Sequence, residues 1–265
     1  MADRCTTIEL ISSLKIPLYM VSAAPLIYSW FYSGLSRLPV FLLSIIFVLA
    51  SQFLMNTVMD RLDRGYGKKC IKRGSFIPVG PCIFECIDAR RMMETVPLII
   101  MLAMAVLVLI ITRLLLLIAF GVMAIILMFA YLYPPLMLYR RGIGEISTFF
   151  DFGPLLLLGT YYAFTGNIEY LLLPASIGFG LVASAIRLSH HIIEEPESST
   201  RKKLYAPAFF IMVIASSLVT WKISATHVIL TIVSLFVAIM PNMVKDSQKV
   251  TSAALVYLII FAFLA

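Results

Sequence analysis

The sequence contains few charged residues and few of the cysteines and histidines that build metal sites. Only 13% of its 265 residues are charged, and it has 4 cysteines and 3 histidines. By contrast, 61% of the residues are hydrophobic and the mean hydropathy is +0.99. This balance excludes an ordinary soluble domain, in which about a quarter of the residues are charged. We therefore expect an integral membrane protein.

Long apolar runs recur along the chain, and most approach the roughly 20 residues that a helix needs to cross a bilayer. We therefore expect an all-α polytopic membrane protein whose nine transmembrane helices form a bundle around a central cavity. The expected spans are residues 8–32, 38–59, 93–112, 114–133, 148–165, 168–187, 206–221, 226–241 and 250–265.

The charges predict the orientation of these spans. With the N-terminus in the cytoplasm, 18 of the 21 Lys and Arg residues and 13 of the 14 acidic residues fall on the cytoplasmic side. Cytoplasmic loops carry such an excess of positive charge, so we expect a cell-membrane protein with its active side facing the cytoplasm. This bias, with attraction to anionic headgroups, also explains the net charge of +7. We expect membrane lipid as a partner and no nucleic acid.

The cysteines give little indication of a metal site. Cys5, Cys70, Cys82 and Cys86 all lie on the side predicted to be cytoplasmic, where thiols stay reduced. Cys82 and Cys86 lack a second spaced pair and a histidine cluster in their loop, which disfavours a zinc site. We therefore expect free thiols.

Two long polar loops, residues 60–92 and 189–205, follow the second and sixth expected spans. They lie four spans apart on the same side, as equivalent loops do when two halves of a bundle frame one cavity. Each loop contains acidic residues near its start.

The first acidic group is Asn56, Asp60 and Asp63. Their spacing of four and three places them on one face if the second span continues as a helix. Amide and carboxylate oxygens are ligands for Mg²⁺ that also holds substrate phosphates. An equally weighted alternative is that both aspartates merely pair with neighbouring arginines at the membrane surface. The cations that follow, and that would neutralise phosphate oxygens, are Arg61, Arg64, Lys68, Lys69, Lys72 and Arg73.

The second acidic group lies in SHHIIEEPESSTRKK, residues 189–203. Pro196 disfavours helix at the preceding residue, so the sixth helix should end there. Carboxylates at the negative end of a helix dipole need a cation nearby. A zinc or iron site on the two histidines is a weaker alternative, because the HExxH spacing is absent. The acids are Glu194, Glu195 and Glu197, and the candidate cations are Mg²⁺, Arg187, Arg201, Lys202 and Lys203.

Between these loops, the stretch YLYPPLMLYRRGIGEISTFFDFGPLLLLGTYYAFTG, residues 131–166, carries an ordered string of motifs. A PP turn, a basic cluster and a G-x-G-E element precede F-G-P and L-G-T-Y-Y. This string resembles the UbiA superfamily of intramembrane prenyltransferases, closest to its menaquinone-type (MenA, 1,4-dihydroxy-2-naphthoate prenyltransferase-like) branch. Asn56 and Asp60 fit the family's NxxxD motif, residues 77–80 (IPVG) resemble its L-P-S-G segment, and Lys15 takes the place of a family Arg.

The chain also departs from the family pattern. Thr57 stands where many members carry a second Asp, and Tyr139 where a Lys is common. In the second motif, usually N-N-x-R-D-x-x-x-D, Glu194 keeps the first carboxylate, whereas Ser198 replaces the last one. The remaining motif positions are His190, His191, Ile192 and Ile193, and Glu195 and Glu197 are displaced candidates for the second carboxylate.

The resemblance implies one prenyltransferase domain over residues 1–265, acting with Mg²⁺ on a polyprenyl diphosphate and an aromatic, quinone-precursor-like acceptor. Alternatives are a non-quinone acceptor, such as an ether lipid or a tetrapyrrole, and a degenerate isoprenoid-binding homologue without activity. Asp151, inside the fifth expected span, would either pair with Arg187 or face the cavity as an acid or base. The resemblance and the residue pattern together give three sets of expected site residues, in which Asp63 fits the helical face but not the family spacing. The catalytic residues are Asp60, Glu194 and Asp151; the metal ligands are Asn56, Asp60, Asp63, Glu194, Glu195 and Glu197; the diphosphate-binding residues are Lys15, Lys68, Lys69, Arg140, Arg141 and Arg187.

Overall fold

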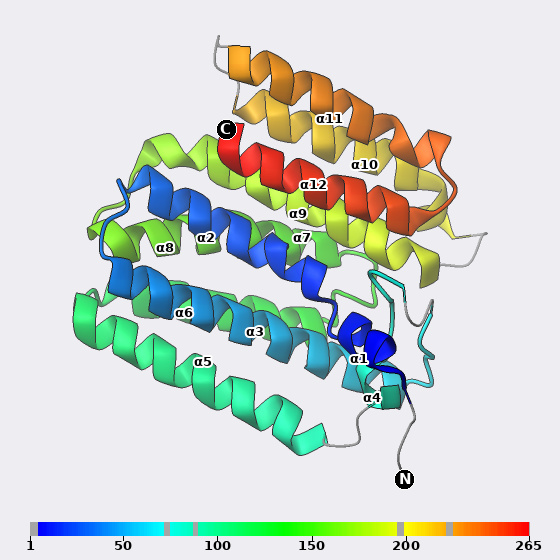
Figure 1. Cartoon of the computed structure of the whole chain (residues 1–265), viewed down its shortest axis with the longest axis horizontal. Coiled ribbons are helices and arrows are strands. Elements are labelled where there is room, and N and C mark those ends of the chain that lie inside the picture. The colour runs from blue at the N-terminus through cyan, green and yellow to red at the C-terminus, as the bar shows by residue number, and fades with distance from the viewer. Residues whose placement is uncertain (1–4, 72–74, 87–89, 195–198, 221–224, 265) are drawn as a thin grey trace. The chain divides into compact units, whose positions relative to one another are not determined.

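The computed structural model describes residues 5–71, 75–86, 90–194, 199–220 and 225–264. Within these ranges the chain is helical, and its only β pairing is one isolated antiparallel bridge between Ile71 and Val79. The predicted all-α class is therefore confirmed. The chain divides into two compact units, one formed by residues 1–23 and 38–113 and the other by residues 24–37 and 114–265 (Figure 1).

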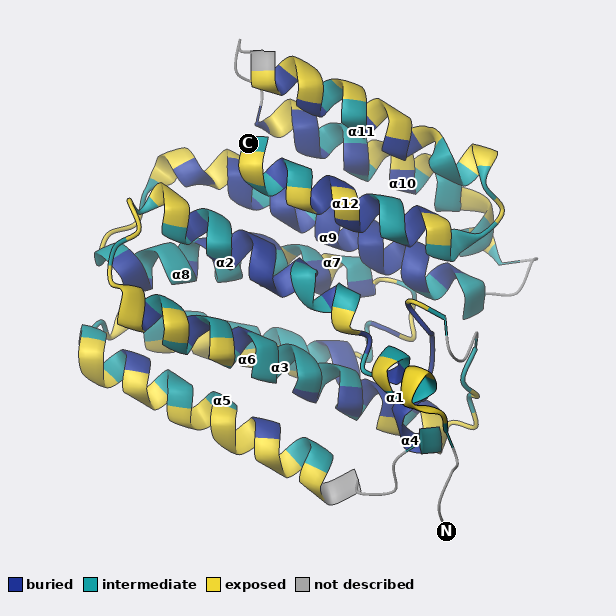
Figure 2. Ribbon diagram, in the orientation of Figure 1, coloured by how far each residue is buried: buried dark blue, intermediate teal, exposed yellow. Residues whose placement is uncertain are grey.

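The first unit is built on two long helices that pack along each other, α3 (Leu38–Gly65) and α5 (Arg90–Thr112). The outward face of α5 is apolar and exposed (Figure 2), as in Ile99 and Ile110, which are 60% and 64% exposed. Such a face suits contact with lipid chains. The smaller elements of this unit are α1 (Thr7–Ser13), η1 (Ile16–Tyr19), the start of α2 (Met20–Tyr32) and α4 (Ile83–Cys86).

The second unit is organised around α9 (Leu173–His191), in which 14 of 19 residues are buried. It contacts helices on several sides, and small residues permit close approach. A Cβ on Gly180 would lie 2.6 Å from the Phe149 carbonyl oxygen. The other elements of this unit are the rest of α2, α6 (Leu116–Leu132), α7 (Gly144–Phe150), the π-helix η2 (Asp151–Leu155), α8 (Leu156–Thr165), η3 (Tyr170–Leu172), η4 (Ile192–Glu194), α10 (Thr200–Val219), α11 (Ala225–Met243) and α12 (Ser247–Leu264).

Buried hydroxyl groups join the last helices of the second unit. Each pairs with a hydroxyl on a neighbouring helix, which satisfies polar groups where no water is available. The bonded pairs are Ser189–Thr251 at 2.8 Å, Ser216–Tyr257 at 2.9 Å and Ser217–Ser234 at 3.1 Å.

Seven helical segments of the described chain are long and apolar enough to cross a membrane, so the protein has a multi-pass architecture. The expectation of nine spans requires two more segments to cross. One is α6, with 17 residues; the other is the region of residues 144–165, which a π-helix containing Pro154 divides. The seven candidates are Thr7–Tyr32, Leu38–Gly65, Met92–Thr112, Tyr170–Glu194, Thr200–Val219, Thr226–Met243 and Ser247–Leu264.

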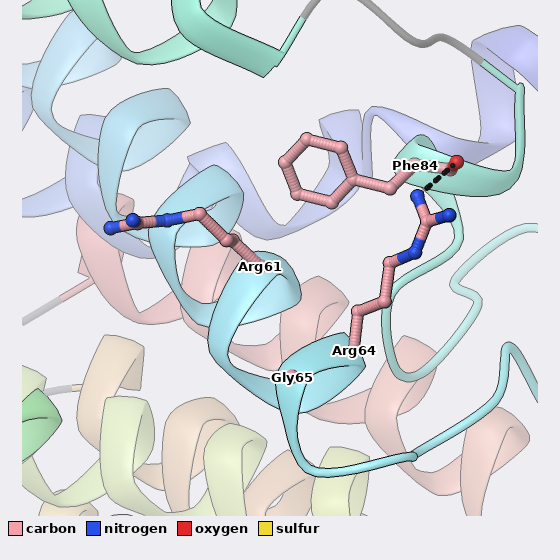
Figure 3. A pocket seen from close by; sticks show the side chains of 4 residues that line it. All are labelled: Arg61, Arg64, Gly65 and Phe84. Atoms are coloured by element: carbon pink, nitrogen blue, oxygen red, sulfur yellow. Dashed lines mark hydrogen bonds between the residues drawn. The ribbon is translucent and has the colours of Figure 1, made fainter.

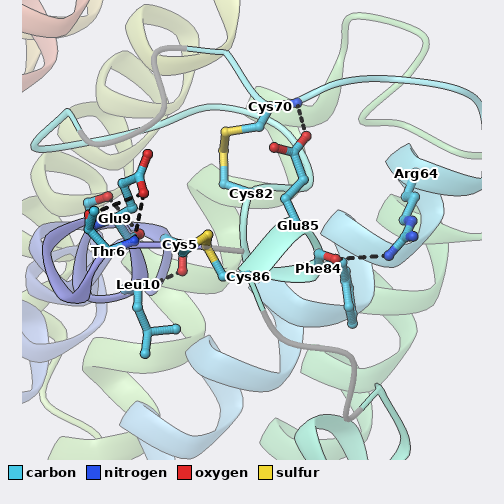
Figure 4. The surroundings of a disulfide bond; sticks show 12 residues. Cys5, Thr6, Glu9, Leu10, Arg64, Cys70, Cys82, Phe84, Glu85 and Cys86 are labelled. Carbon is cyan, nitrogen blue, oxygen red and sulfur yellow. Dashed lines mark hydrogen bonds between the residues drawn. A yellow bond between two sulfur atoms is a disulfide. The ribbon is translucent and has the colours of Figure 1, made fainter. Parts of the chain in front are cut away.

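The expectation of free cysteines is wrong. Cys5 is bonded to Cys86, and Cys70 to Cys82, as Figure 4 shows. Helix α1 contacts α4, which brings together two cysteines separated by 81 residues of sequence. The spacing of the cysteines in the sequence does not predict this contact, because the contact depends on how the N-terminal helix folds back onto the loop after α3.

The two disulfides predict how the cysteines react with maleimide. We expect the untreated protein to resist maleimide labelling at all 4 cysteines and to label fully only after reduction and unfolding, as read by mass spectrometry. Cys5→Ser should lower the free energy of unfolding by about 2 kcal/mol more than Cys82→Ser, because the longer loop loses more entropy when closed. The two loops span 81 and 12 residues. Reactive thiols in the untreated protein would contradict this pairing.

Candidate functional site

A buried ion pair lies at the end of α3 in the first unit. The Lys15 ammonium nitrogen is 2.6 Å from Asp60 Oδ1 and donates a second hydrogen bond, 3.1 Å long, to the carbonyl oxygen of Gly80. The side chains of Lys15 and Asp60 are each only 2% exposed. Breaking such a pair leaves a buried charge without compensation, which is far more costly than breaking a surface pair.

Two unusual backbone positions hold this pair. Lys15 adopts a left-handed conformation with φ of 54° between α1 and η1, which costs about 1–3 kcal/mol for a residue with a Cβ. Gly80 has φ of +86°, and a Cβ there would lie 2.7 Å from the Lys69 carbonyl oxygen. Glycine is therefore needed for the loop to present its carbonyl group to Lys15.

The acidic face of α3 continues as predicted. The helix extends to Gly65, and Asp60 and Asp63 are both buried. Asp63 Oδ1 lies 3.1 Å from the Lys68 ammonium. Asn56 Oδ1 accepts from Gln52 at 3.4 Å, while Asn56 Nδ2 has no hydrogen-bond partner in the described part of the chain.

Among the described residues, the cations paired with these aspartates are Lys15 and Lys68 rather than neighbouring arginines, so the alternative is wrong in its partners, although both aspartates do lie in ion pairs. Arg61 instead pairs with Glu94 on α5 at 2.8 Å, and Arg64 donates to the Phe84 carbonyl oxygen at 2.9 Å. With Gly65 and Phe84, the two arginines line a pocket of about 320 Å³. Figure 3 shows the Phe84 ring between the two arginine side chains. The pairing cations of the aspartates are the two lysines, which lie outside the helix.

The residues on this face include the amide and carboxylate oxygens that Mg²⁺ accepts as ligands. The ammonium groups of Lys15 and Lys68 already lie against the two carboxylates, so a metal ion would compete with these cations for the same oxygens. Over the described residues, no three His, Cys, Asp or Glu side chains form a group that could hold a metal ion. A magnesium ion here would therefore depend on phosphate oxygens and water for part of its coordination, as is usual for Mg²⁺.

A second polar cluster lies in the second unit. Glu145 on α7 accepts hydrogen bonds from Arg187 Nη1 at 2.6 Å and from Arg201 Nη2 on α10, both at its Oε1 atom. Arg187 Nε also donates to the Tyr131 hydroxyl at 3.0 Å, and the guanidinium lies 5.1 Å from the centre of that ring. Sequence reasoning had not selected Glu145 or Tyr131, although both belong to the 131–166 motif string.

The predicted pairing of Asp151 with Arg187 is wrong. Arg187 is bound to Glu145 instead, because both residues face each other where α7 contacts α9. Asp151 Oδ2 accepts a hydrogen bond from Ser147 Oγ at 3.2 Å, one helical turn earlier. Its role as an acid or base stays a prediction.

The remaining predicted residues are less enclosed. Lys69, Arg140 and Arg141 are exposed, and Arg141 Nη2 donates to the Pro135 carbonyl oxygen at 2.6 Å. Glu194 ends η4, close to where the sixth helix was predicted to end. Glu195 and Glu197 lie outside the described residues.

Comparison of the chain with protein-family models, with curated proteins and with solved structures finds no match in any of the three. Function is therefore inferred from the residues, their geometry and the motif resemblance.

The buried ion pair predicts that a variant of Lys15 loses more stability than a variant of the more exposed Arg61. Lys15→Met leaves Asp60 buried without its cation and should lower the free energy of unfolding by about 3–5 kcal/mol. Arg61→Gln breaks the pair with Glu94, in which the arginine is 46% exposed, and should cost less than about 1 kcal/mol. Thermal unfolding in detergent measures both.

The double variant Lys15→Met/Asp60→Asn serves as the control, since it removes both charges. It should regain most of the stability that Lys15→Met loses. Equal losses for Lys15→Met and Arg61→Gln would contradict a buried, tightly coupled pair.

Proposed function

We propose that the chain is a UbiA-type membrane prenyltransferase, which transfers a polyprenyl group from a polyprenyl diphosphate to an aromatic, quinone-precursor-like acceptor with the help of Mg²⁺. One observation carries most of the support. Three separate segments that resemble the family, at Lys15, at Asn56 to Asp60 and at residues 77–80, meet in the contact of Lys15 with Asp60 and Gly80. A chance resemblance gives no reason for three distant motifs to converge.

The second unit supports the same proposal independently. The G-x-G-E element and the helix that leads into the second motif are joined by the contact between Glu145 and Arg187. This link depends on residues 42 positions apart, so local sequence similarity alone does not produce it.

We infer one functional domain of nine spans around a central cavity, with the N-terminus and the active side facing the cytoplasm and the protein in the cell membrane. In this orientation both disulfides face the cytoplasm, a placement known from intracellular proteins of hyperthermophiles and rare elsewhere.

In this scheme, Mg²⁺ would be held by Asn56, Asp60 and Asp63 together with the acids of the second motif, and it would supply positive charge to the diphosphate leaving group. Lys68, whose side chain is 32% exposed, would contact phosphate oxygens. Lys15 is enclosed by Asp60 and Gly80, so its role would be to hold Asp60 in place. The second-motif acids are Glu194, Glu195 and Glu197, and the further cations proposed to bind the diphosphate are the exposed Lys69, Arg140 and Arg141. Arg187, which the motif resemblance also implies, is enclosed and bound to Tyr131 and Glu145.

The chemical step breaks the allylic C–O bond, whose electron pair leaves with the diphosphate. The electron-rich ring of the acceptor then attacks the allylic carbocation and loses a proton. Asp151 is the proposed acceptor of that proton, because it is the carboxylate that lies a turn inside an apolar helical segment of the second unit.

A non-catalytic isoprenoid-binding role is the second candidate. It is favoured by the changed second motif, in which His190 is buried at 4% exposure and its ring packs edge-on against His191. Transfer to an ether lipid or a tetrapyrrole is the remaining alternative, and it differs only in the acceptor.

An activity assay tests the enzyme proposal. Purified protein in detergent is incubated with geranylgeranyl diphosphate, Mg²⁺ and 1,4-dihydroxy-2-naphthoate, and mass spectrometry detects prenylated product. Asp60→Asn should lower turnover by at least about 100-fold, because a charged ligand at the leaving group contributes several kcal/mol to the transition state. EDTA should abolish the wild-type activity.

Glu169→Gln is the matched control, since it changes an acid that lies outside the proposed site and should leave turnover unchanged. Ether-lipid and tetrapyrrole precursors are tested in parallel as acceptors. Absence of product with every acceptor, together with diphosphate binding that is indifferent to EDTA, would overturn the enzyme proposal and favour the binding role.

A further inference from the structure

Four side chains in the second unit form a continuous chain of contacts. Tyr131 on α6 accepts from Arg187 on α9, Arg187 donates to Glu145 on α7, and Glu145 accepts from Arg201 on α10. We call these four residues the arginine relay. It joins four helices through side chains whose partners lie 42 to 56 residues apart in sequence.

The two arginines occupy different environments within the relay. Arg187 is 7% exposed, and its Nε and Nη1 atoms are used by Tyr131 and Glu145. A Cβ on Gly144 would lie 2.6 Å from the Arg187 Cζ atom, so the guanidinium packs directly on the backbone there. Arg187 is therefore enclosed and is held in one orientation.

Arg201 is the more accessible of the two, with 16% of its side chain exposed. It lies in the first turn of α10, and its stem packs 3.5 Å from the position of a Cβ on Gly142. Its contact with Glu145 restrains a side chain that would otherwise lose rotamer entropy on binding a ligand. A guanidinium fixed in this way binds phosphate oxygens at a lower entropic cost.

We propose that Glu145 is a positioning residue, which holds Arg201 through the relay so that Arg201, rather than the enclosed Arg187, contacts the diphosphate of the substrate. The identity of this ligand rests on the proposed function, whereas the relay itself rests on the contacts above. Arg187 and Tyr131 act as the support that keeps Glu145 in place.

A positioning role and charge alone predict opposite effects of Glu145→Gln on the binding of an anion. Glu145→Gln removes a negative charge, which by charge alone should strengthen the binding of an anion. If Glu145 positions Arg201, the same change weakens binding, because the guanidinium loses its charge-assisted hydrogen bond and its fixed orientation. We expect Glu145→Gln to weaken binding of inorganic pyrophosphate by about 10-fold, and Arg201→Gln by about 10- to 100-fold.

Two further variants separate positioning from folding. Gly144→Ala leaves every charge intact and displaces Arg187, so it should also weaken pyrophosphate binding. Asp246→Asn removes one negative charge from a residue whose carboxylate accepts from the Gln248 backbone, outside the relay, and should not weaken binding. Thermal unfolding of each variant establishes that the protein tested is folded.

The experiment is calorimetric titration of the purified full chain with inorganic pyrophosphate and Mg²⁺, arranged as a double-mutant cycle. In the Arg201→Gln background, Glu145→Gln should have no further effect, because it acts through Arg201. In steady-state kinetics, Glu145→Gln should raise KM for the prenyl diphosphate and leave KM for the acceptor unchanged.

The outcomes distinguish the two proposals. Failure of the wild-type protein to bind pyrophosphate would overturn both. Wild-type binding with Glu145→Gln unchanged or tighter, or with additive losses in the double variant, would overturn the positioning role of Glu145 and leave the proposed function standing.

Discussion

A charge enclosed among apolar helices is tolerated only beside an opposite charge, because neither water nor lipid chains can solvate it. Both polar clusters of this protein obey that constraint. Asp60 is held by Lys15, and Glu145 is held by Arg187 and Arg201. Removing Lys15, Asp60 or Glu145 would leave a buried charge uncompensated, whereas Glu145 keeps one arginine when the other is removed.

The ion pair in the first unit also explains the loop that follows α3. The segment from residue 75 to 86 is largely buried, although it lies between two long helices and contains only one short helix, α4. Its Gly80 carbonyl accepts a second hydrogen bond from the Lys15 ammonium, and two disulfides tie the segment to the N-terminal residues and to the residues after α3. The segment therefore packs against the buried charge of Lys15 in a fixed conformation.

The two clusters differ in what they offer a ligand. In the first unit, each buried carboxylate has one lysine ammonium against it. In the second unit, two guanidinium groups share one carboxylate oxygen. Cations of both kinds bind phosphate oxygens, so each cluster by itself is compatible with the proposed diphosphate substrate. The second motif departs from the family pattern at His190, His191 and Ser198.

Hydropathy and a period of 3.6 residues are local properties, so the amino-acid sequence alone predicts the helical class, the membrane character and the shared acidic face of α3. It also singles out Lys15, Asp60 and Arg187. Their partners are visible only in the folded chain: Lys15 for Asp60, Glu145 rather than Asp151 for Arg187, and Cys86 for Cys5. Such partners lie 42 to 81 residues away along the chain. They depend on which helix faces meet, and that outcome is set by packing across the whole unit rather than by any local pattern.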